Sequence, residues 1–313
     1  MRKVLDIYSI GEMVIDFIPG TTLGSYIRNA GGAPANVAIA MARNGLQAGM
    51  CCSVGDDDFG RFLVDTLKEN EVTCLRPGLC ENAITTMAFV NLAKDGERTF
   101  TFARKPGADM FLCEEDVKET DIRNTVIVHA GSCSLSASPA AEATVRALKL
   151  GHEYGKLVSF DVNYRNLMWK DDQDACTQKV MEILPYVDIL KISEEEVEMI
   201  GGEAGLFDLM ERCGLTLIME TLGASGAKCY FDGQILRSAG RQAKAVDATG
   251  AGDAFWGGFL SSLRIQGVER ADQLTVEKIQ KAMEYGNTAG WICVQSKGAI
   301  SSLPTREEIE KYL

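Results

Sequence analysis

Residues 246–260 read Val-Asp-Ala-Thr-Gly-Ala-Gly-Asp-Ala-Phe-Trp-Gly-Gly-Phe-Leu. Apolar residues continue at helical spacing as far as Leu263, so we predict that a helix begins at the glycine-rich turn. Because Gly250 and Gly252 lack a Cβ atom, the backbone there can approach a ligand closely. The unpaired amides of the first helical turn and the positive end of the helix dipole point to the same spot. This stretch therefore predicts a phosphate-binding site.

Asp253 lies within the predicted first turn. A carboxylate beside an anion-binding set of amides suits a general base that acts on a group attacking the phosphate. The alternative interpretation is a helix N-cap, since aspartate is a favoured capping residue. We favour the base because the whole string 246–253 combines two glycines and a carboxylate at one helix start.

A second glycine-rich helix start lies at residues 30–38, Ala-Gly-Gly-Ala-Pro-Ala-Asn-Val-Ala. Pro34 suits the first position of a helix. The exposed amides at Gly31 and Gly32, together with the Asn36 side chain, would then read the hydroxyl groups of a polar ligand. A tight turn without a ligand is the alternative.

An acidic residue, Asp16, interrupts the apolar strand pattern of residues 11–17. A carboxylate is costly to bury without hydrogen-bond donors, so a set of sugar hydroxyls is a natural partner. A backbone hydrogen bond is the alternative.

The rest of the chain alternates short apolar runs with helix-period segments, which is typical of a mostly parallel sheet with helices on both faces. One helix is expected at 57–70, with its apolar face packed on the sheet. The candidate strands are 4–10, 47–54, 125–130, 156–161, 187–192 and 215–221.

Two regions, 12–30 and 84–105, break this rhythm and read as strand hairpins. Lys94-Asp95-Gly96 suits a tight hairpin turn, and residues 99–102 alternate with the period of two that marks a strand. We predict that they form a small β element standing off the main sheet. No linker or internal repeat divides the chain, so residues 1–313 are expected to form one domain.

Composition excludes several classes of function. The chain has 32 basic and 44 acidic residues, a net charge of −12, which disfavours binding to nucleic acid. No stretch approaches the roughly 20 apolar residues that cross a bilayer, so no membrane association is expected. The ten cysteines are scattered and only two histidines accompany them, so we expect reduced, mostly buried thiols in a cytoplasmic protein.

GGAPANVA and DATGAGD, in this order and separation, resemble the two signatures of the ribokinase-like, or phosphofructokinase-B, carbohydrate kinase family. The segments GEMVIDFIPG, FDVNYRNLMW and KISEEEVEMIGG resemble fructokinases in particular. The resemblance spans the chain and implies a three-layer α/β/α fold with a β lid. It also implies transfer of the γ-phosphate of ATP, with Mg²⁺, to the primary hydroxyl of a furanose sugar, with fructose favoured. Aminoimidazole riboside kinase, 2-keto-3-deoxygluconate kinase and a non-catalytic sugar sensor or structural protein are the alternatives.

The resemblance also implies roles for individual residues. Asp253 would be the base, and the amides of Gly250, Ala251, Gly252 and Asp253 itself would form the anion hole. The sugar would be held by Asp16, Gly31, Gly32 and Asn36, with Arg104 and Arg165 as candidates to contact sugar or phosphate, unless each only pairs with a nearby carboxylate.

The nucleotide would be bordered by Ser193, Thr221, Gly223, Gly226, Asn287 and Gly298. Glu196 would organise Mg²⁺ through water, although Ser193 replaces the asparagine of the family motif. Asp247 and Thr249 are a candidate site for a monovalent cation such as K⁺. Two lids would pair to form a homodimer.

Overall fold

The computed structural model describes residues 4–22, 24–76, 78–92 and 98–313. Within these residues a nine-stranded sheet runs in the order β13-β12-β11-β10-β9-β8-β1-β4-β5. All neighbouring strands from β11 to β5 are parallel, and β12 and β13 add an antiparallel hairpin. The strands are β1 (Leu5–Ile10), β4 (Ala48–Cys51), β5 (Thr73–Cys74), β8 (Thr125–Gly131), β9 (Leu157–Asp161), β10 (Ile189–Ser193), β11 (Leu217–Thr221), β12 (Gly226–Phe231) and β13 (Gln234–Ala239).

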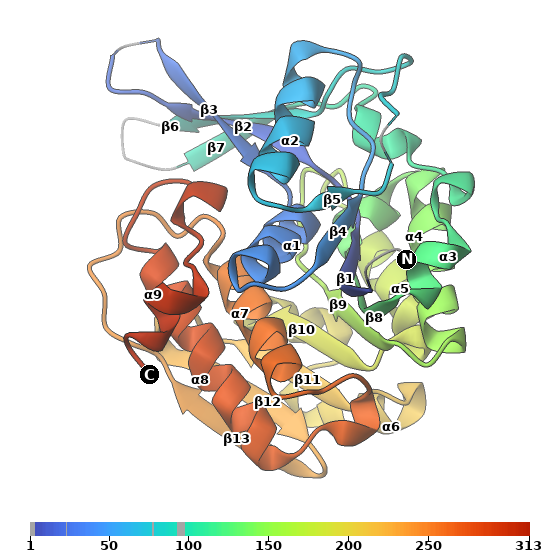
Figure 1. Ribbon diagram of the computed structural model, residues 1–313, viewed down its shortest axis with the longest axis vertical. Helices are drawn as coiled ribbons and strands as arrows, with labels where there is room; N and C mark the ends of the chain where they lie inside the picture. The colour runs from blue at the N-terminus through green and yellow to red at the C-terminus, as the bar shows by residue number, and fades with distance from the viewer. Residues whose placement is uncertain (1–3, 23, 77, 93–97) are drawn as a thin grey trace.

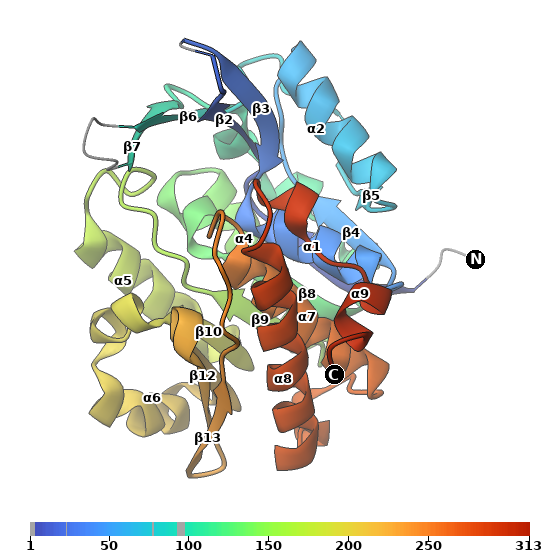
Figure 2. The ribbon, with the colours of Figure 1, turned by 90° about the vertical axis from the view of Figure 1, so that its left-hand side faces the viewer.

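Helices cover both faces of this sheet, which gives the three layers that were predicted (Figure 2). One face carries α1 (Ala33–Arg43), α2 (Asp58–Glu69), α7 (Ala251–Ile265) and α8 (Val276–Cys293). The other carries α3 (Glu119–Arg123), α4 (Ala140–Glu153), α5 (Gln173–Ile183) and α6 (Leu206–Cys213). A short helix, α9 (Arg306–Glu310), packs on α8. Each face buries its own apolar cluster, so the sheet lies between two cores.

A second, four-stranded sheet has the order β3-β2-β6-β7. Its strands are β2 (Val14–Pro19), β3 (Tyr26–Gly31), β6 (Met87–Leu92) and β7 (Arg98–Ala103). Figures 1 and 2 both show this small sheet at the top of the molecule, far from α6 at the bottom. The predicted β element at 12–30 and 84–105 is confirmed, and its predicted turn Lys94-Asp95-Gly96 lies outside the described residues.

The predicted strands agree well with the observed ones, and helix 57–70 is observed as α2. The expectation that the whole apolar face of α2 packs on the main sheet is wrong in part. Leu63 and Leu67 enter the core, but the Phe59 ring meets Phe17 of the small sheet at 5.6 Å. The guanidinium of Arg28, also from the small sheet, lies over the Phe62 ring. Helix α2 therefore holds the small sheet to the main body.

Two further observations bear on the composition. Seven of the ten cysteine thiols are buried and the other three are half-buried, as predicted. In the part of the chain that the structure describes, no helix is long and apolar enough to cross a membrane.

Candidate active site

Helix α7 begins where the glycine-rich turn was predicted to start it. Gly250 is the N-cap residue and has a φ of 78°, in the left-handed region. A Cβ atom at this position would lie 2.8 Å from the Cβ of Ala299, which is too close. Glycine is therefore required at 250 by both backbone conformation and space.

The amides of this turn are mostly free to bind an anion. The Ala251 amide donates to the Ala248 carbonyl at 3.2 Å. Among the residues that the structure describes, no acceptor is found for the amides of Gly250, Gly252 and Asp253. Three N–H groups at a helix N-terminus form an anion site together with the helix dipole.

The Asp253 side chain turns toward α1 and not back onto its own helix. Its Oδ2 accepts a hydrogen bond of 2.7 Å from Nδ2 of Asn36. Because Gly250 occupies the N-cap, the capping interpretation of Asp253 is wrong. Burial raises the pKa of Asp253 to about 6, although the Asn36 hydrogen bond opposes this rise. The carboxylate is thus poised near the pH at which a general base works best.

Asp16 on β2 brings a second carboxylate to the same place. Burial raises its pKa to about 6; the Arg165 charge lowers this pKa, and the Asp253 charge raises it. A Cβ atom at Gly31 would collide with the Asp16 carboxylate, so that glycine makes room for it. The next glycine, Gly32, has a φ of 116° and packs against the backbone of Glu12 and Met13, which precede β2.

The two candidate arginines are placed differently. Arg104 forms an ion pair of 2.8 Å with Asp109 and also donates to Ser136 Oγ at 3.2 Å, so its guanidinium is largely occupied. Arg165 is exposed, and its charge lowers the pKa of Asp16 and of Asp253. Of the two arginines, only Arg165 has no hydrogen-bond acceptor among the described residues, so its donors remain for a ligand.

Glu196 follows β10 as predicted, and both of its oxygens accept backbone hydrogen bonds. Oε2 accepts from the Ser193 amide at 2.8 Å, and Oε1 accepts from the Tyr164 amide at 2.6 Å. Burial raises the pKa of this carboxyl, the Asp161 charge raises it further, and the Lys191 charge lowers it. Ser193, in turn, ends strand β10 and caps the turn that carries Glu196.

Sequence reasoning missed Asp161 and Lys191, which face each other across β9 and β10. The Lys191 ammonium lies 2.7 Å from Asp161 Oδ2 in a buried ion pair. Their signal was present, because each is a charged residue inside an apolar strand pattern, the same argument that singled out Asp16.

Glu12 was missed as well. Its Oε1 accepts a hydrogen bond of 3.2 Å from the Ala33 amide at the start of α1. Burial raises the pKa of Glu12 to about 7, and its own backbone amide lowers it. Glu12 therefore fixes the helix start that carries Asn36, next to Asp253.

The residues predicted to border the nucleotide lie at the ends of β10 and β11, in the turn that leads into β12, on α8 and just after α8. Asn287 on α8 donates to Ser238 Oγ at 2.8 Å, which ties α8 to β13. Thr221 Oγ1 donates to the Ile192 carbonyl at 3.3 Å. Gly223 and Gly226 have φ values of 54° and 100° in the turn between β11 and β12, where glycine is favoured.

Asp247 organises the loop that leads into α7. Its Oδ1 accepts hydrogen bonds from the Thr249 amide at 3.0 Å and from Thr249 Oγ1 at 2.7 Å. Its Oδ2 accepts from the Gly298 amide at 3.0 Å. The predicted cation site and one predicted nucleotide-border residue therefore meet at a single carboxylate.

The donor set at the ends of β9 and β10 fits Mg²⁺. Among the described residues, no group of three or more His, Cys, Asp and Glu side chains could hold a metal ion on its own. Mg²⁺ in phosphoryl-transfer sites is bound through one or two carboxylates, waters and the phosphates of the substrate. Buried Glu196 supplies such a carboxylate, and in the described part of the chain Oδ1 of the neighbouring Asp161 has no hydrogen-bond partner.

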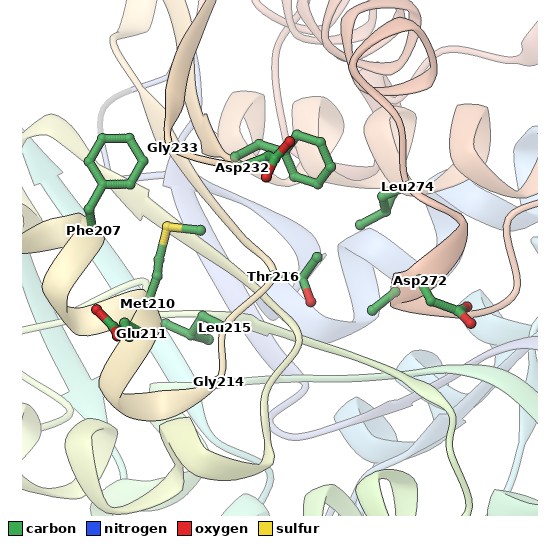
Figure 3. A pocket seen from close by; sticks show the side chains of 12 residues that line it. Phe207, Met210, Glu211, Gly214, Leu215, Thr216, Asp232, Gly233, Asp272 and Leu274 are labelled. Carbon is green, nitrogen blue, oxygen red and sulfur yellow. The ribbon is translucent and has the colours of Figure 1, made fainter.

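A pocket of about 560 Å³ lies elsewhere (Figure 3). It is lined by Phe207 and Met210 of α6, by the Asp232-Gly233 turn and by residues just before β11. Because these residues precede β11, the pocket lies at the amino end of that strand, whereas Asp161 and Ser193 lie at the carboxyl ends of theirs. The pocket contains none of the predicted site residues.

Comparison with known proteins shows relatives that match nearly the whole chain. A fructokinase-1 of Oryza sativa subsp. japonica is 38% identical over 320 residues, covering 98% of this chain and 97% of the relative. The structure of a Vibrio cholerae O395 fructokinase in fructose, ADP and calcium ion bound form has a TM-score of 0.89 at 32% identity, covering 99% of both chains.

A Salmonella enterica aminoimidazole riboside kinase complexed with aminoimidazole riboside and an ATP analog has a TM-score of 0.84 at 28% identity, covering 97% of this chain and 98% of the other. The model of the pfkB family carbohydrate kinases matches residues 4–306. That match takes in both glycine-rich helix starts and nearly the whole chain between and around them. The chain therefore belongs to the pfkB family of carbohydrate kinases.

Proposed function

We propose that this enzyme transfers the γ-phosphoryl group of ATP to the primary hydroxyl of fructose, which gives fructose 6-phosphate and ADP. The observation that carries the proposal is the buried Asp253 carboxylate, which Asn36 holds beside the start of α7. Three amides of that helix start have no acceptor among the described residues. The fructokinase names of relatives that cover nearly the whole chain support fructose as the acceptor.

In this proposal, the oxygen of the fructose hydroxyl attacks the γ-phosphorus and ADP departs. Asp253 takes the proton from that hydroxyl during the attack. With a pKa of about 6, roughly nine in ten Asp253 carboxyls are ionised at pH 7 and ready to accept that proton. The free amides of the α7 turn stabilise the negative charge on the transferred group. Phosphoryl transfer requires mainly this alignment and charge stabilisation.

The sugar is held at the start of α1 and on β2. Asp16 accepts hydrogen bonds from sugar hydroxyls, and the glycines at 31 and 32 allow the backbone to approach the sugar closely. Asn36 contacts both the sugar and the base Asp253. Arg165 contacts the sugar or the moving phosphate. Arg104 is kept only as a positioning residue, since its guanidinium is already paired with Asp109.

The nucleotide lies along the loops after β10, β11 and β13. Its predicted border consists of Ser193, Thr221, Gly223, Gly226, Asn287 and Gly298. Glu196 would hold Mg²⁺ through water, and the ion, when bound, neutralises charge on the phosphates. Asp247 and Thr249 remain the proposed site for K⁺ or another monovalent cation.

The small sheet acts as a lid that closes over the sugar and keeps water from ATP. We further propose that two lids pair in a homodimer, because Tyr26 and Ile27 of β3 are 43% and 54% exposed. Phe102 packs against the core instead, and the side chain of Phe100 lies outside the described part of the chain. A cytoplasmic location is proposed because ATP and ten free thiols both suit that compartment.

A single assay distinguishes the proposed acceptor from the alternatives. ADP release is measured with fructose, ribose, aminoimidazole riboside, 2-keto-3-deoxygluconate and no sugar, and the phosphorylated position is assigned by ³¹P NMR. We expect the highest kcat/KM with fructose and phosphate on O6. A higher value with aminoimidazole riboside would favour the second candidate, which the Salmonella structure supports. If a sugar binds but no sugar leads to ADP release, the protein would be a sugar sensor.

A further inference from the structure

A buried ion pair lies directly beneath the anion hole. Lys191 on β10 and Asp161 on β9 are register partners in adjacent parallel strands, and their charged atoms are 2.7 Å apart. The side chains are only 6% and 2% exposed. A buried pair of this kind loses much hydration and often contributes little net stability, so its presence calls for a second reason.

The pair leaves hydrogen-bonding capacity unused. An ammonium group has three N–H donors, and among the described residues Lys191 spends one, on Asp161 Oδ2. The other carboxylate oxygen, Oδ1, is buried and has no partner in the same set of residues. Buried polar groups are normally satisfied, so the two remaining N–H donors of Lys191 indicate an anionic ligand. Asp161 Oδ1 is an acceptor, so it would face Mg²⁺ or a donor group and not a phosphate oxygen.

The geometry at Gly252 shows where the Lys191 ammonium lies relative to the helix start. A Cβ atom at Gly252 would be 3.6 Å from Lys191 Nζ and 3.9 Å from Cε. In an α-helix the Cα–Cβ bond tilts toward the N-terminus, which is the end that binds the anion. Lys191 Nζ therefore lies beside the first turn of α7, on the side of the free Gly252 and Asp253 amides.

Carboxylates surround Lys191, since the charges of Asp161, Glu196 and Asp253 all act on its ammonium group. These three carboxylates would otherwise repel the phosphates of ATP. Lys191 is the buried cation among them, whereas Arg165 approaches from the exposed side.

We infer that Lys191 is a further catalytic residue, whose ammonium contacts the transferred phosphoryl group next to the Gly252 amide, and that Asp161 positions it. The inference rests on the proposed kinase function and adds a cation to the amides already assigned there. No bond to lysine forms or breaks, and its proton stays in place. The ammonium stabilises charge that grows on the phosphoryl oxygens during transfer.

The test compares Lys191→Met with a matched control, Lys228→Met. Lys228, whose side chain is 14% exposed, is likewise paired with carboxylates, Glu203 at 3.0 Å and Glu220 at 3.3 Å, but it lies on β12 away from α7. For Lys191→Met we expect kcat to fall about 10²- to 10³-fold, as when one donor of an anion hole is removed. The KM for fructose should stay within about threefold, and Lys228→Met should keep kcat within about threefold.

Binding gives a second readout that is independent of turnover. Calorimetry with MgADP alone and with MgADP plus aluminium fluoride and fructose compares the ground state with a mimic of the transferred group. Lys191→Met should weaken the aluminium fluoride complex about 100-fold and MgADP alone less than fivefold. Equal loss of both affinities would overturn the inference, because Lys191 would then bind only the nucleotide.

The remaining outcomes are also decisive. If the methionine variant does not fold, Lys191→Ala is assayed instead, with and without added methylamine. Methylamine should raise the kcat of this variant at least tenfold. Absence of rescue in a folded alanine variant, or a kcat for Lys191→Met within threefold of wild type, refutes the role of Lys191. A wild-type enzyme without kinase activity on any sugar refutes the proposed function instead.

Discussion

The substitution Asp253→Asn tests the site through activity and stability at the same time. Asparagine keeps the shape of the side chain and the acceptor for Asn36 Nδ2, but it cannot take a proton or carry charge. Loss of a positioned general base reduces turnover by about 10²- to 10⁴-fold. We therefore expect kcat to fall by that factor while the KM for ATP changes little.

The same change should stabilise the protein without ligands. Burial raises the pKa of Asp253 from an ordinary 3.8 to about 6, so the folded state binds the proton more tightly than the unfolded state. Ionising Asp253 in the folded state therefore lowers the free energy of unfolding. This loss is absent below pH 3.8, grows as the pH rises to 6 and is complete above pH 6. At 1.36 kcal/mol for each pH unit, the loss is roughly 1 to 2 kcal/mol at pH 5 and about 3 kcal/mol at pH 8.

Urea unfolding at pH 5 and pH 8 measures this difference. Asp253→Asn should raise the free energy of unfolding by about 3 kcal/mol at pH 8, or Tm by about 5 °C for a chain of this length, and by about half as much at pH 5. The control is Asp272→Asn, a change at a mostly exposed aspartate, which should alter stability by less than 0.5 kcal/mol at either pH. A gain that does not depend on pH, or no gain, would show that the Asp253 carboxyl is not desolvated, and near-normal turnover would remove it from the mechanism.

Three further substitutions give separate readings of the site. Asn36→Ala removes the hydrogen bond that lowers the pKa of Asp253, so the acid limb of the pH profile of kcat/KM should move to higher pH by about one unit. If the acid limb does not move, Asn36 does not hold the Asp253 carboxylate. Asp16→Asn should raise the KM for fructose about 10- to 100-fold with the KM for ATP unchanged, and equal effects on both would place Asp16 outside the sugar site. Gly250→Ala should cost about 2 kcal/mol in urea unfolding because of its φ of 78°, whereas Gly252→Ala should keep stability within 1 kcal/mol but lose turnover; equal stability of the two would refute the left-handed turn.

The helix starts were predictable because their signals are local. Gly250, Asp253 and Asn36 lie within short strings whose spacing alone encodes a turn, a helix and a side chain in its first turns. The contact between Asn36 and Asp253 joins two helices that are 217 residues apart in the chain, and only the family resemblance placed them together beforehand. Spacing predicts an element, but it does not predict which elements become neighbours.

The parts that were missed were missed for three different reasons. Strand β5 has only two residues, too few for a hydrophobic period. The hairpin of β12 and β13 did carry a signal, since Asp232-Gly233 is the same dipeptide that predicted the turn at residues 95 and 96. Asp232 and Gly233 both have positive φ values, as such a turn requires. Lys191 and Asp161 become partners only because β9 lies beside β10, which the order of strands along the chain does not state.

A site that buries several carboxylates needs support from apolar packing around it. Trp256 follows Asp253 by three residues, stacks on Phe259 at 5.0 Å and donates through Nε1 to Ser159 Oγ at 3.0 Å. Ser159 lies two residues before Asp161 on β9, so this contact fixes the start of α7 against the strand that positions Lys191. The apolar face of α7 thus offsets the electrostatic cost of its polar end, and the two ends must be placed by one rigid helix for the base, the amides and the buried ammonium to reach the same phosphoryl group.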